Sequence, residues 1–353
     1  MIIKNALLQN GISDLKIENG KIIEIGKFSE KGDIDALGKR VIPGLIDVHI
    51  HGFSGVDFSD DDFYKIDEAL VKSGTTSYLA TLMTGSVEET EKLTKRGIPE
   101  LKGNMLGYHL EGPYISEKKS GAQNKAYIKN PDIEEFYRFK NVRKITIAPE
   151  LIGAIDFIKT TDISVSIGHT DCDYDTAILA IEAGANSLTH TFNAMPPILH
   201  RAPGPIGAAA EKGIYAEIIC DGIHVEKAAF LAAYKMFGSE KLILISDAIR
   251  PAGSPDGKYD SGGLLVVMQD SIARLTDGTL AGGSGSLLCG VKKAVEFGVD
   301  FYEAVKMASE TPAKSLGLKK GVIKEGYDAD LVILDDDMTV LKTIVSGNVV
   351  YSL

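Results

Sequence analysis

The chain has 353 residues, 44% of them hydrophobic and 25% charged, which is the composition of a globular protein with one large domain or two smaller ones. Its formal net charge of -11 argues against binding to nucleic acid or to an anionic membrane, because either partner attracts a basic surface. The three cysteines form no CxxC pair and no segment is apolar over the roughly 18 residues of a membrane span, so we expect buried thiols and a cytoplasmic protein.

The two ends of the chain have the pattern of short strands joined by turns. Near the N-terminus these segments are residues 1–8, 13–18 and 21–28, and Asn19-Gly20 is a typical hairpin turn between the last two. Residues 329–335 and 342–351 repeat the pattern near the C-terminus. We therefore expect residues 1–42 and 320–353 to pair as a small β-sandwich domain built from both chain ends.

Residues 43–319 alternate between apolar, β-branched segments and amphipathic ones. The expected strands are residues 44–52, 75–84, 104–113, 144–151, 163–170, 187–194, 214–225 and 241–249. The expected helices include residues 63–74, 86–98, 174–185, 225–238 and 290–310, the last after a glycine-rich loop at 277–286. Eight strand-helix units in succession predict an α/β fold, a (β/α)8 TIM barrel.

Histidines and carboxylates recur at the C-terminal ends of these strands. His49 and His51 close the first strand, where residues two apart point to the same face. The later strand ends carry, in chain order, Glu111, His169, His190, His224 and Asp247. Because the C-terminal ends of all barrel strands meet at one mouth, we expect these side chains to lie close together.

Each of these residues also has an ordinary structural interpretation. A single histidine at a strand end is usually structural, which is how we interpret His109 and His200; Glu111 could form an ion pair and Asp247 could cap a helix. Together, however, several imidazoles and two carboxylates are costly to bury unless a cation compensates them. Imidazole and carboxylate ligands suit zinc or iron. A metal site with Asp247 as acid and base predicts hydrolysis of an amide or a related bond.

The motifs resemble those of the amidohydrolase superfamily and, within it, the N-acetylglucosamine-6-phosphate deacetylases. PGLIDVHIHG (43–52) is typical of the superfamily, whereas HLEGPY (109–114), LTHTFNAM (188–195) and DGIHV (221–225) together are typical of the deacetylases. The motifs GHT (168–170), RAPGPIGAA (201–209), SDA (246–248) and DGTLAGG (277–283) follow the same order, so the similarity covers nearly the whole chain. The implied reaction converts N-acetylglucosamine 6-phosphate to glucosamine 6-phosphate and acetate, a step of amino-sugar catabolism.

The resemblance also implies roles for individual residues. Glu111, His169 and His190 would hold the principal divalent ion, zinc or iron. His49 and His51 would hold a second ion that Glu111 could bridge, giving one or two ions per subunit. Asp247 would be the catalytic acid and base.

Further residues would bind the sugar phosphate: Asn193, Ala194, His224 and Arg201. The resemblance implies a homodimer in which Arg201 reaches the neighbouring site. Gln123 would also contact the substrate; it stands where many relatives have a histidine thought to polarise the substrate carbonyl, and glutamine can donate only a neutral hydrogen bond. Ala202 stands where an acidic residue is usual, which is a second departure from the pattern of the family.

Two other functions compete with this one. The first is another hydrolase of the superfamily, acting on a cyclic amide or an aminated base. Dihydroorotases and hydantoinases usually carry a lysine at a central strand end, whereas the fourth strand here, residues 144–151, ends in Pro149 and Glu150, and Glu111 occupies an earlier strand. A barrel that binds a metal or a sugar phosphate without turnover would have no need of Asp247 facing the metal. Both observations favour the deacetylase.

Overall fold

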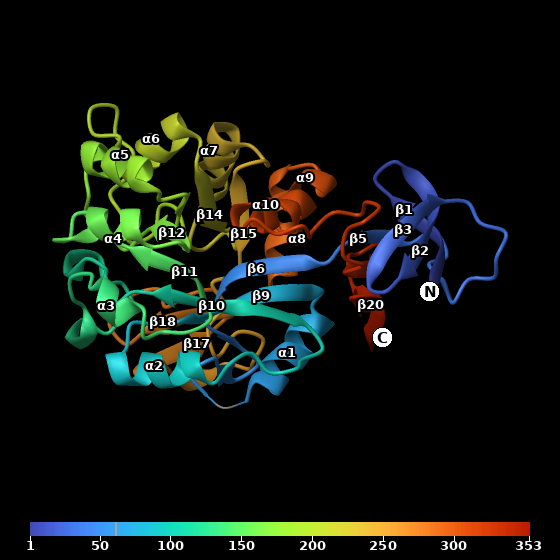
Figure 1. Ribbon diagram of the computed structural model, residues 1–353, viewed down its shortest axis with the longest axis horizontal. Coiled ribbons are helices and arrows are strands. Elements are labelled where there is room, and N and C mark those ends of the chain that lie inside the picture. Colours follow the sequence, from blue (N-terminus) through green and yellow to red (C-terminus); the bar gives the residue numbers. More distant parts are fainter. Residues whose placement is uncertain (61) are drawn as a thin grey trace.

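The computed structural model describes residues 1–60 and 62–353 and contains a parallel eight-stranded sheet within them. Its strands pair in chain order and are β6 (Leu45–Ile50), β9 (Thr75–Leu82), β10 (Asn104–Glu111), β11 (Val142–Ile147), β12 (Ser164–Ile167), β13 (Ser187–Leu188), β14 (Tyr215–Ile219) and β15 (Leu242–Ile245). Past the last strand, the Asp247 amide donates to the His49 carbonyl at 3.0 Å, and the His51 amide donates to the Ala248 carbonyl at 2.8 Å. These bonds join β15 to β6, and the predicted barrel is confirmed (Figure 1).

The barrel strands are apolar because they are covered on both faces. Every residue of β6, β9 and β15 is buried, and the helices lie around the outside of the barrel (Figure 1). The helices are α1 (Phe63–Lys72), α2 (Val87–Lys95), α3 (Ile133–Phe136), α4 (Ala154–Thr160), α5 (Tyr174–Ala183), α6 (Gly204–Lys212), α7 (Lys227–Phe237), α8 (Leu287–Phe297), α9 (Phe301–Met307) and α10 (Glu310–Ser315), with 3-10 turns η1 (Glu117–Lys119) and η2 (Lys125–Tyr127). No helix within the described residues has the length and apolar character that crossing a bilayer requires.

The last predicted helix is wrong in its extent. Residues 290–310 do not form one helix, because α8 ends before Gly298, whose φ of +106° is a left-handed conformation. Asp300 then starts α9, and its carboxylate accepts from the amides of Tyr302 and Glu303. Both helices are amphipathic and have the same periodicity, so the hydrophobic pattern alone predicts one continuous helix across the break.

A second sheet, the small sheet, is built from both chain ends. Its strands are β1 (Ile2–Leu8), β2 (Gly11–Glu18), β3 (Lys21–Gly26), β4 (Ile34–Asp35), β5 (Arg40–Pro43), β19 (Leu331–Leu334), β20 (Val340–Val345) and β21 (Asn348–Ser352). The antiparallel pairing of β19 with β5 joins the two ends, and the small sheet lies beside the barrel (Figure 1). Asn19 and Gly20 have φ values of 49° and 73° and form the expected tight hairpin turn. The domain limits at residues 42 and 320 stay a prediction.

Two short pairings had no counterpart among the predicted elements. In the segment of the chain between β15 and α8, an antiparallel sheet is formed by β16 (Gly257–Ser261), β17 (Leu264–Gln269) and β18 (Ile272–Leu275). Elsewhere, β7 (Gly52–Phe53) pairs with β8 (Val56–Asp57). The glycine-rich segment after β18 returns to the barrel, where the Gly283 amide donates to the Asp247 carbonyl at 2.8 Å. The cysteines are unpaired; Cys172 and Cys220 are buried as expected, but Cys289 is exposed.

Candidate metal centre and active site

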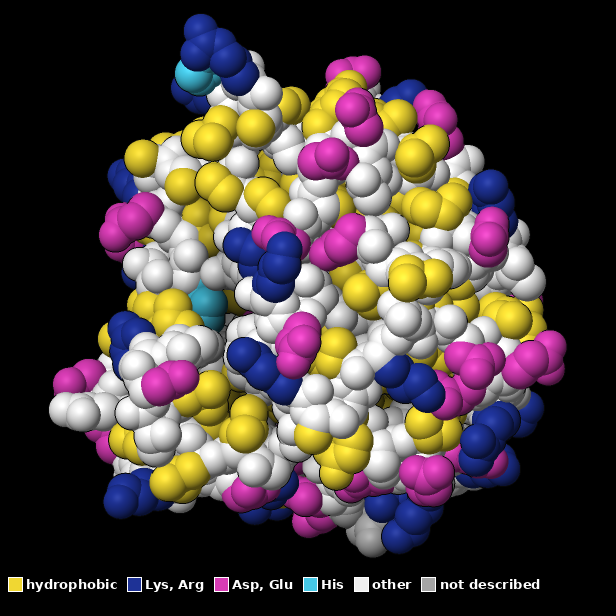
Figure 2. Space-filling view, turned by 90° about the vertical axis from the view of Figure 1, so that its left-hand side faces the viewer, with side chains coloured by type: hydrophobic (Ala, Val, Ile, Leu, Met, Phe, Trp, Pro, Cys, Tyr) yellow, Lys and Arg dark blue, Asp and Glu magenta, His cyan; other side chains and the backbone are white. Residues whose placement is uncertain are grey.

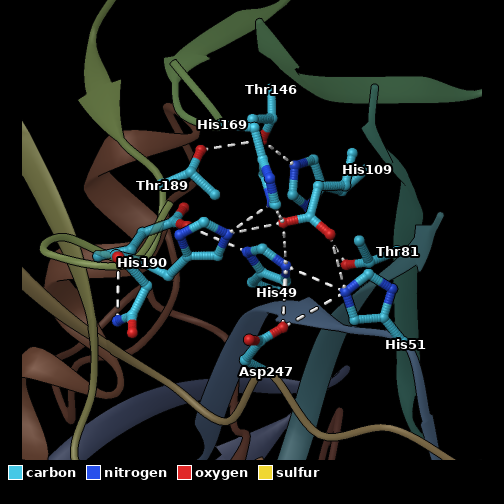
Figure 3. A network of polar contacts seen from close by, with 12 residues as sticks. His49, His51, Thr81, His109, Thr146, His169, Thr189, His190 and Asp247 are labelled. Carbon is cyan, nitrogen blue, oxygen red and sulfur yellow. Dashed lines mark hydrogen bonds and ion pairs between the residues drawn. The ribbon is translucent and has the colours of Figure 1, made fainter. Parts of the chain in front are cut away.

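Six of the seven histidines and carboxylates predicted from the strand ends converge, whereas the seventh, His224, lines the cavity beside them. His49 lies on β6 and His51 just beyond it, Glu111 is the last residue of β10, and the remaining members follow their strands by two residues: His169 after β12, His190 after β13 and Asp247 after β15. Figure 3 shows the side chains of the four histidines and of Asp247 pointing toward one another. All of them are buried.

The side chains form two groups around one carboxylate. In the first cluster (Glu111, His169 and His190), Glu111 Oε1 lies 3.1 Å from His169 Nε2 and 2.9 Å from His190 Nε2. In the second cluster (His49, His51 and Asp247), Asp247 Oδ1 lies 3.2 Å from His49 Nε2 and 3.3 Å from His51 Nε2. Glu111 also contacts the second cluster, with Oε2 lying 3.2 Å from His51 Nε2. Each cluster brings its ligand atoms within 4.8 Å of one another.

For two of the histidines, a hydrogen-bond partner outside the clusters determines which ring nitrogen faces the centre. His169 Nδ1 lies 2.8 Å from the Lys119 carbonyl, which only accepts, so Nδ1 carries the proton and Nε2 presents its lone pair. His49 Nδ1 lies 3.3 Å from Glu217 Oε2, and the same reasoning applies. Nitrogen lone pairs and carboxylate oxygens that converge in this way are a donor set that fits a divalent cation.

The electrostatics of the clusters also favour a positive charge beside the carboxylates. Burial disfavours the ionised carboxylates, but the surrounding histidines outweigh it and hold the pKa values of Glu111 and Asp247 below their ordinary range. Burial likewise disfavours protonated imidazole, yet these carboxylates raise the pKa of His49 well above 6.5 and that of His51 to about 9. The carboxylates therefore need a compensating charge, either protons on these two histidines or a metal ion.

The backbone is strained where three of these side chains turn into the mouth. His169, His190 and Asp247 have φ values of 45°, 29° and 48°, in the left-handed region that L-residues seldom adopt. Gly168 precedes His169 at a point of close approach, because a Cβ there would lie 2.5 Å from the Thr189 side chain. Residues held in such sparsely populated conformations often lie at functional sites.

A cavity of about 370 Å³ opens over the two clusters. Its walls include several predicted substrate contacts, namely Gln123, Asn193, Ala194 and His224, together with Lys118, Lys119 and the segment 279–282. The face of the molecule shown in Figure 2 has a hollow in which a histidine is visible, with basic side chains nearby. Arg201 is exposed and is not among the described residues that line this cavity.

Gln123 makes a contact that the sequence did not predict. Its Nε2 donates to Glu111 Oε2 at 2.5 Å, and its Oε1 accepts from the Thr84 amide at 2.8 Å. Both ends of the amide are thus engaged, and one of them orients the shared carboxylate. The expected contact of Gln123 with a substrate carbonyl stays a prediction.

His224 and His109 have different surroundings. His224 Nδ1 lies 2.7 Å from Asp221 Oδ2; burial opposes its protonation, but Asp221 raises the pKa of His224 above 6.5. His109 lies between the hydroxyls of Thr81 and Thr146, and burial holds its pKa well below the ordinary value. A neutral imidazole held by two hydroxyls agrees with the structural interpretation of His109.

Sequence reasoning missed two charged residues beneath the clusters. Lys144 on β11 and Glu217 on β14 form a buried ion pair, and Glu217 also contacts His49. The available signal was a charge inside an otherwise apolar strand segment, in KITI and YAEII. Such a charge is rarely buried without a partner.

Comparison with known proteins places the chain in a family. Residues 40–350 match the amidohydrolase family. The chain is 37% identical to N-acetylglucosamine-6-phosphate deacetylase of Bacillus subtilis, over 99% of this chain and 95% of that protein. It is 34% identical to the human protein of the same name, over 96% of this chain and 91% of that protein. The chain belongs to the amidohydrolase family and, within it, to the N-acetylglucosamine-6-phosphate deacetylases.

Solved deacetylases have the same fold over the full length. The enzyme from Thermotoga maritima gives a TM-score of 0.92 at 32% identity and covers 100% of both chains. A mutant of the Mycobacterium smegmatis enzyme, solved in complex with N-acetyl-D-glucosamine-6-phosphate, gives a TM-score of 0.93 at 31% identity and covers 100% of this chain and 99% of that one. The family predicted from the motifs is therefore confirmed, as is the barrel with its small β domain.

Proposed function

We propose that the protein hydrolyses the N-acetyl group of N-acetylglucosamine 6-phosphate, giving glucosamine 6-phosphate and acetate. The observation that carries this proposal is the meeting of Glu111, the four histidines and Asp247, most of which line one cavity, in a chain similar to deacetylases over its whole length. A cavity of about 370 Å³ lies in the usual range for small-molecule sites.

Metal binding is assigned to the two clusters. Glu111, His169 and His190 hold the principal ion, and burial lowers the pKa of His190, which keeps it the neutral imidazole that a metal requires. His49 and His51 hold a second ion beside Glu111. Zinc and ferrous iron both suit this donor set. A bound divalent cation supplies Lewis-acid chemistry, which activates water and an amide carbonyl at neutral pH.

Asp247 is the acid and base of the reaction. Its carboxylate is ionised at neutral pH and faces the centre, with Oδ1 3.2 Å from His49 Nε2, where it can accept a proton from water. It takes a proton from the attacking water as the C–O bond forms. It returns that proton to the sugar nitrogen as the C–N bond breaks, so that acetate and a free amine leave.

The phosphate group is bound by residues on the cavity wall away from the clusters. His224 is a cationic donor because Asp221 raises its pKa, and Asn193 and Ala194 lie on the same cavity wall. Arg201 acts in the neighbouring subunit of a homodimer. Leu199 and Ala202 exchange two backbone hydrogen bonds of 3.1 Å, which place His200 and Arg201 at the exposed tip of a tight turn.

Apolar side chains beside this turn support the homodimer. Ile198 and Leu199 are 41% and 55% exposed next to Arg201, and apolar residues exposed together are a feature of subunit interfaces. A planar guanidinium is also a good partner for a phosphate dianion.

The function is tested by measuring acetate release from N-acetylglucosamine 6-phosphate and from unphosphorylated N-acetylglucosamine. We expect a much larger kcat/KM for the phosphorylated sugar, loss of activity after dialysis against a chelator, and recovery on adding zinc or ferrous iron. Equal rates on both sugars, or full activity in the metal-free protein, would contradict the proposal.

Asp221→Asn is expected to raise KM for the phosphorylated sugar about tenfold just above pH 6.5, which is the effect of losing one charge-assisted hydrogen bond. A raised pKa means that His224 stays charged above pH 6.5 in the native protein, whereas without Asp221 the burial that opposes protonation lowers its pKa, so the charge is lost at a lower pH. The KM values of the two proteins should therefore converge as the pH is lowered. The unphosphorylated sugar is the control, and a KM ratio that does not change with pH would refute the role of His224.

Arg201→Ala is expected to raise KM for the phosphorylated sugar at least tenfold and to leave KM for the unphosphorylated one nearly unchanged. Mixing this variant with Asp247→Asn tests subunit sharing, because a mixed dimer contains one site with both residues intact. Activity should then return to a substantial fraction of one native site. Mixtures that stay inactive although mixed dimers form would place Arg201 outside the neighbouring site.

A further inference from the structure

A buried ion pair lies inside the barrel, beneath the second cluster. Lys144 Nζ contacts Glu217 Oε1, and the two side chains are 2% and 1% exposed. Among the described residues, no other lysine is counted as buried. An apolar pair of similar volume usually stabilises a barrel interior at least as well as an ion pair does, so stability alone does not account for these residues.

The second oxygen of Glu217 is directed at a proposed metal ligand. Glu217 Oε2 lies 3.3 Å from His49 Nδ1, while His49 Nε2 lies 3.2 Å from His51 Nε2 on the other side of the ring. A series of polar contacts thus runs from Lys144 through Glu217 to His49 and the second cluster. Because a carboxylate only accepts, this contact holds the His49 proton on Nδ1 and turns the Nε2 lone pair toward the centre.

His49 differs from the other histidines of the two clusters because its Nδ1 faces a charged partner. His169 has a neutral backbone carbonyl on its Nδ1, and within the described residues Nδ1 of His51 and of His190 has no hydrogen-bond partner. The charged partner therefore supports the second cluster, for which the resemblance left one or two ions per subunit open.

We propose that Glu217, charge-compensated by Lys144, is the positioning residue of the second metal site. Glu217 fixes the tautomer and the ring orientation of His49, and Lys144 makes this possible in a dry interior by balancing the carboxylate. The inference rests on the metal-dependent function proposed above and deepens it, because it names the residues that orient a ligand of the second ion. Outer partners of this kind typically change metal affinity by 10- to 100-fold.

The test compares two double variants that both lack the ion pair. In K144M/E217Q the amide oxygen can still accept from His49 Nδ1, whereas K144M/E217L has no acceptor. Zinc is titrated into each chelator-stripped protein by calorimetry, and circular dichroism checks the fold. We expect K144M/E217L to bind its second ion roughly 10- to 100-fold more weakly than the native protein, with the first ion changed less than about threefold. The affinity of K144M/E217Q for the second ion should lie between those of K144M/E217L and the native protein.

Several outcomes would overturn the proposal: a native protein that binds one ion only, a second ion that binds both double variants with the native affinity, or equal weakening of both ions. Imidazole ¹⁵N shifts of the native zinc protein give a measurement that does not depend on how the variants fold. We expect the His49 proton on Nδ1, and a proton on Nε2 would refute the assignment. Because no substrate is used, a protein that binds two ions without deacetylase activity would contradict the proposed function and leave this inference standing.

Discussion

Asp247→Asn is expected to lower kcat by roughly 10²- to 10⁴-fold, the contribution of a well-placed general acid and base. An amide in place of the carboxylate can neither take a proton from water nor return it to the departing amine. The variant should keep its fold and the ion of the first cluster, because Asp247 is not one of the residues of that cluster. Steady-state kinetics with metal analysis on the same sample makes the measurement.

The pH profile adds a second check on Asp247. The carboxylate has a lowered pKa, so in the native protein it is ionised at neutral pH and above. Residual activity of the variant should rise with hydroxide concentration at high pH, because a base from solution replaces the missing one. A kcat within threefold of the native value would remove Asp247 from the proton-transfer steps.

Glu111→Gln is expected to have an even broader effect, because Glu111 contacts both clusters. Its Oε1 lies near His169 and His190, and its Oε2 lies near His51. Loss of the charge should weaken binding of the principal ion by more than the roughly 100-fold that the loss of an outer partner costs, and should abolish acetate release. Metal affinity and activity are both measured.

Glu150→Gln is the matched control for that substitution. Glu150 follows β11, the strand next to β10, but its carboxylate accepts from Thr170 and from the Asp171 amide rather than from the clusters. The same chemical change at this position should leave the metal content native. Native zinc affinity in Glu111→Gln would show that this carboxylate is not a ligand.

The barrel could be predicted because its physical requirements appear directly in the sequence. Strands that are buried on both faces must be continuously apolar, so segments such as 242–245 (LILI) stand out. The polar residues of the site could be predicted because they interrupt the apolar segments at the strand ends, as His49 and Glu111 do. Chain order then suffices to bring them together, because parallel strands share one mouth.

The rest of the site depends on contacts that no periodicity encodes. Lys144 and Glu217 are 73 residues apart in the chain and meet only across the barrel interior. Gln123 lies after η1 in an irregular segment, and the direction of its amide is set by the Thr84 backbone. The three-stranded sheet over 257–275 has short strands joined by tight turns, and none of the expected strands or helices covers these residues.

The central claim is that Glu111, His169 and His190 share one divalent ion. Anomalous diffraction from a zinc-soaked crystal, recorded at the zinc absorption edge, tests it most directly. We predict a strong peak about 2.0–2.2 Å from Glu111 and from both histidine Nε2 atoms, the distances of zinc to oxygen and nitrogen ligands. A crystal with zinc bound elsewhere and no peak among these three side chains would contradict the account.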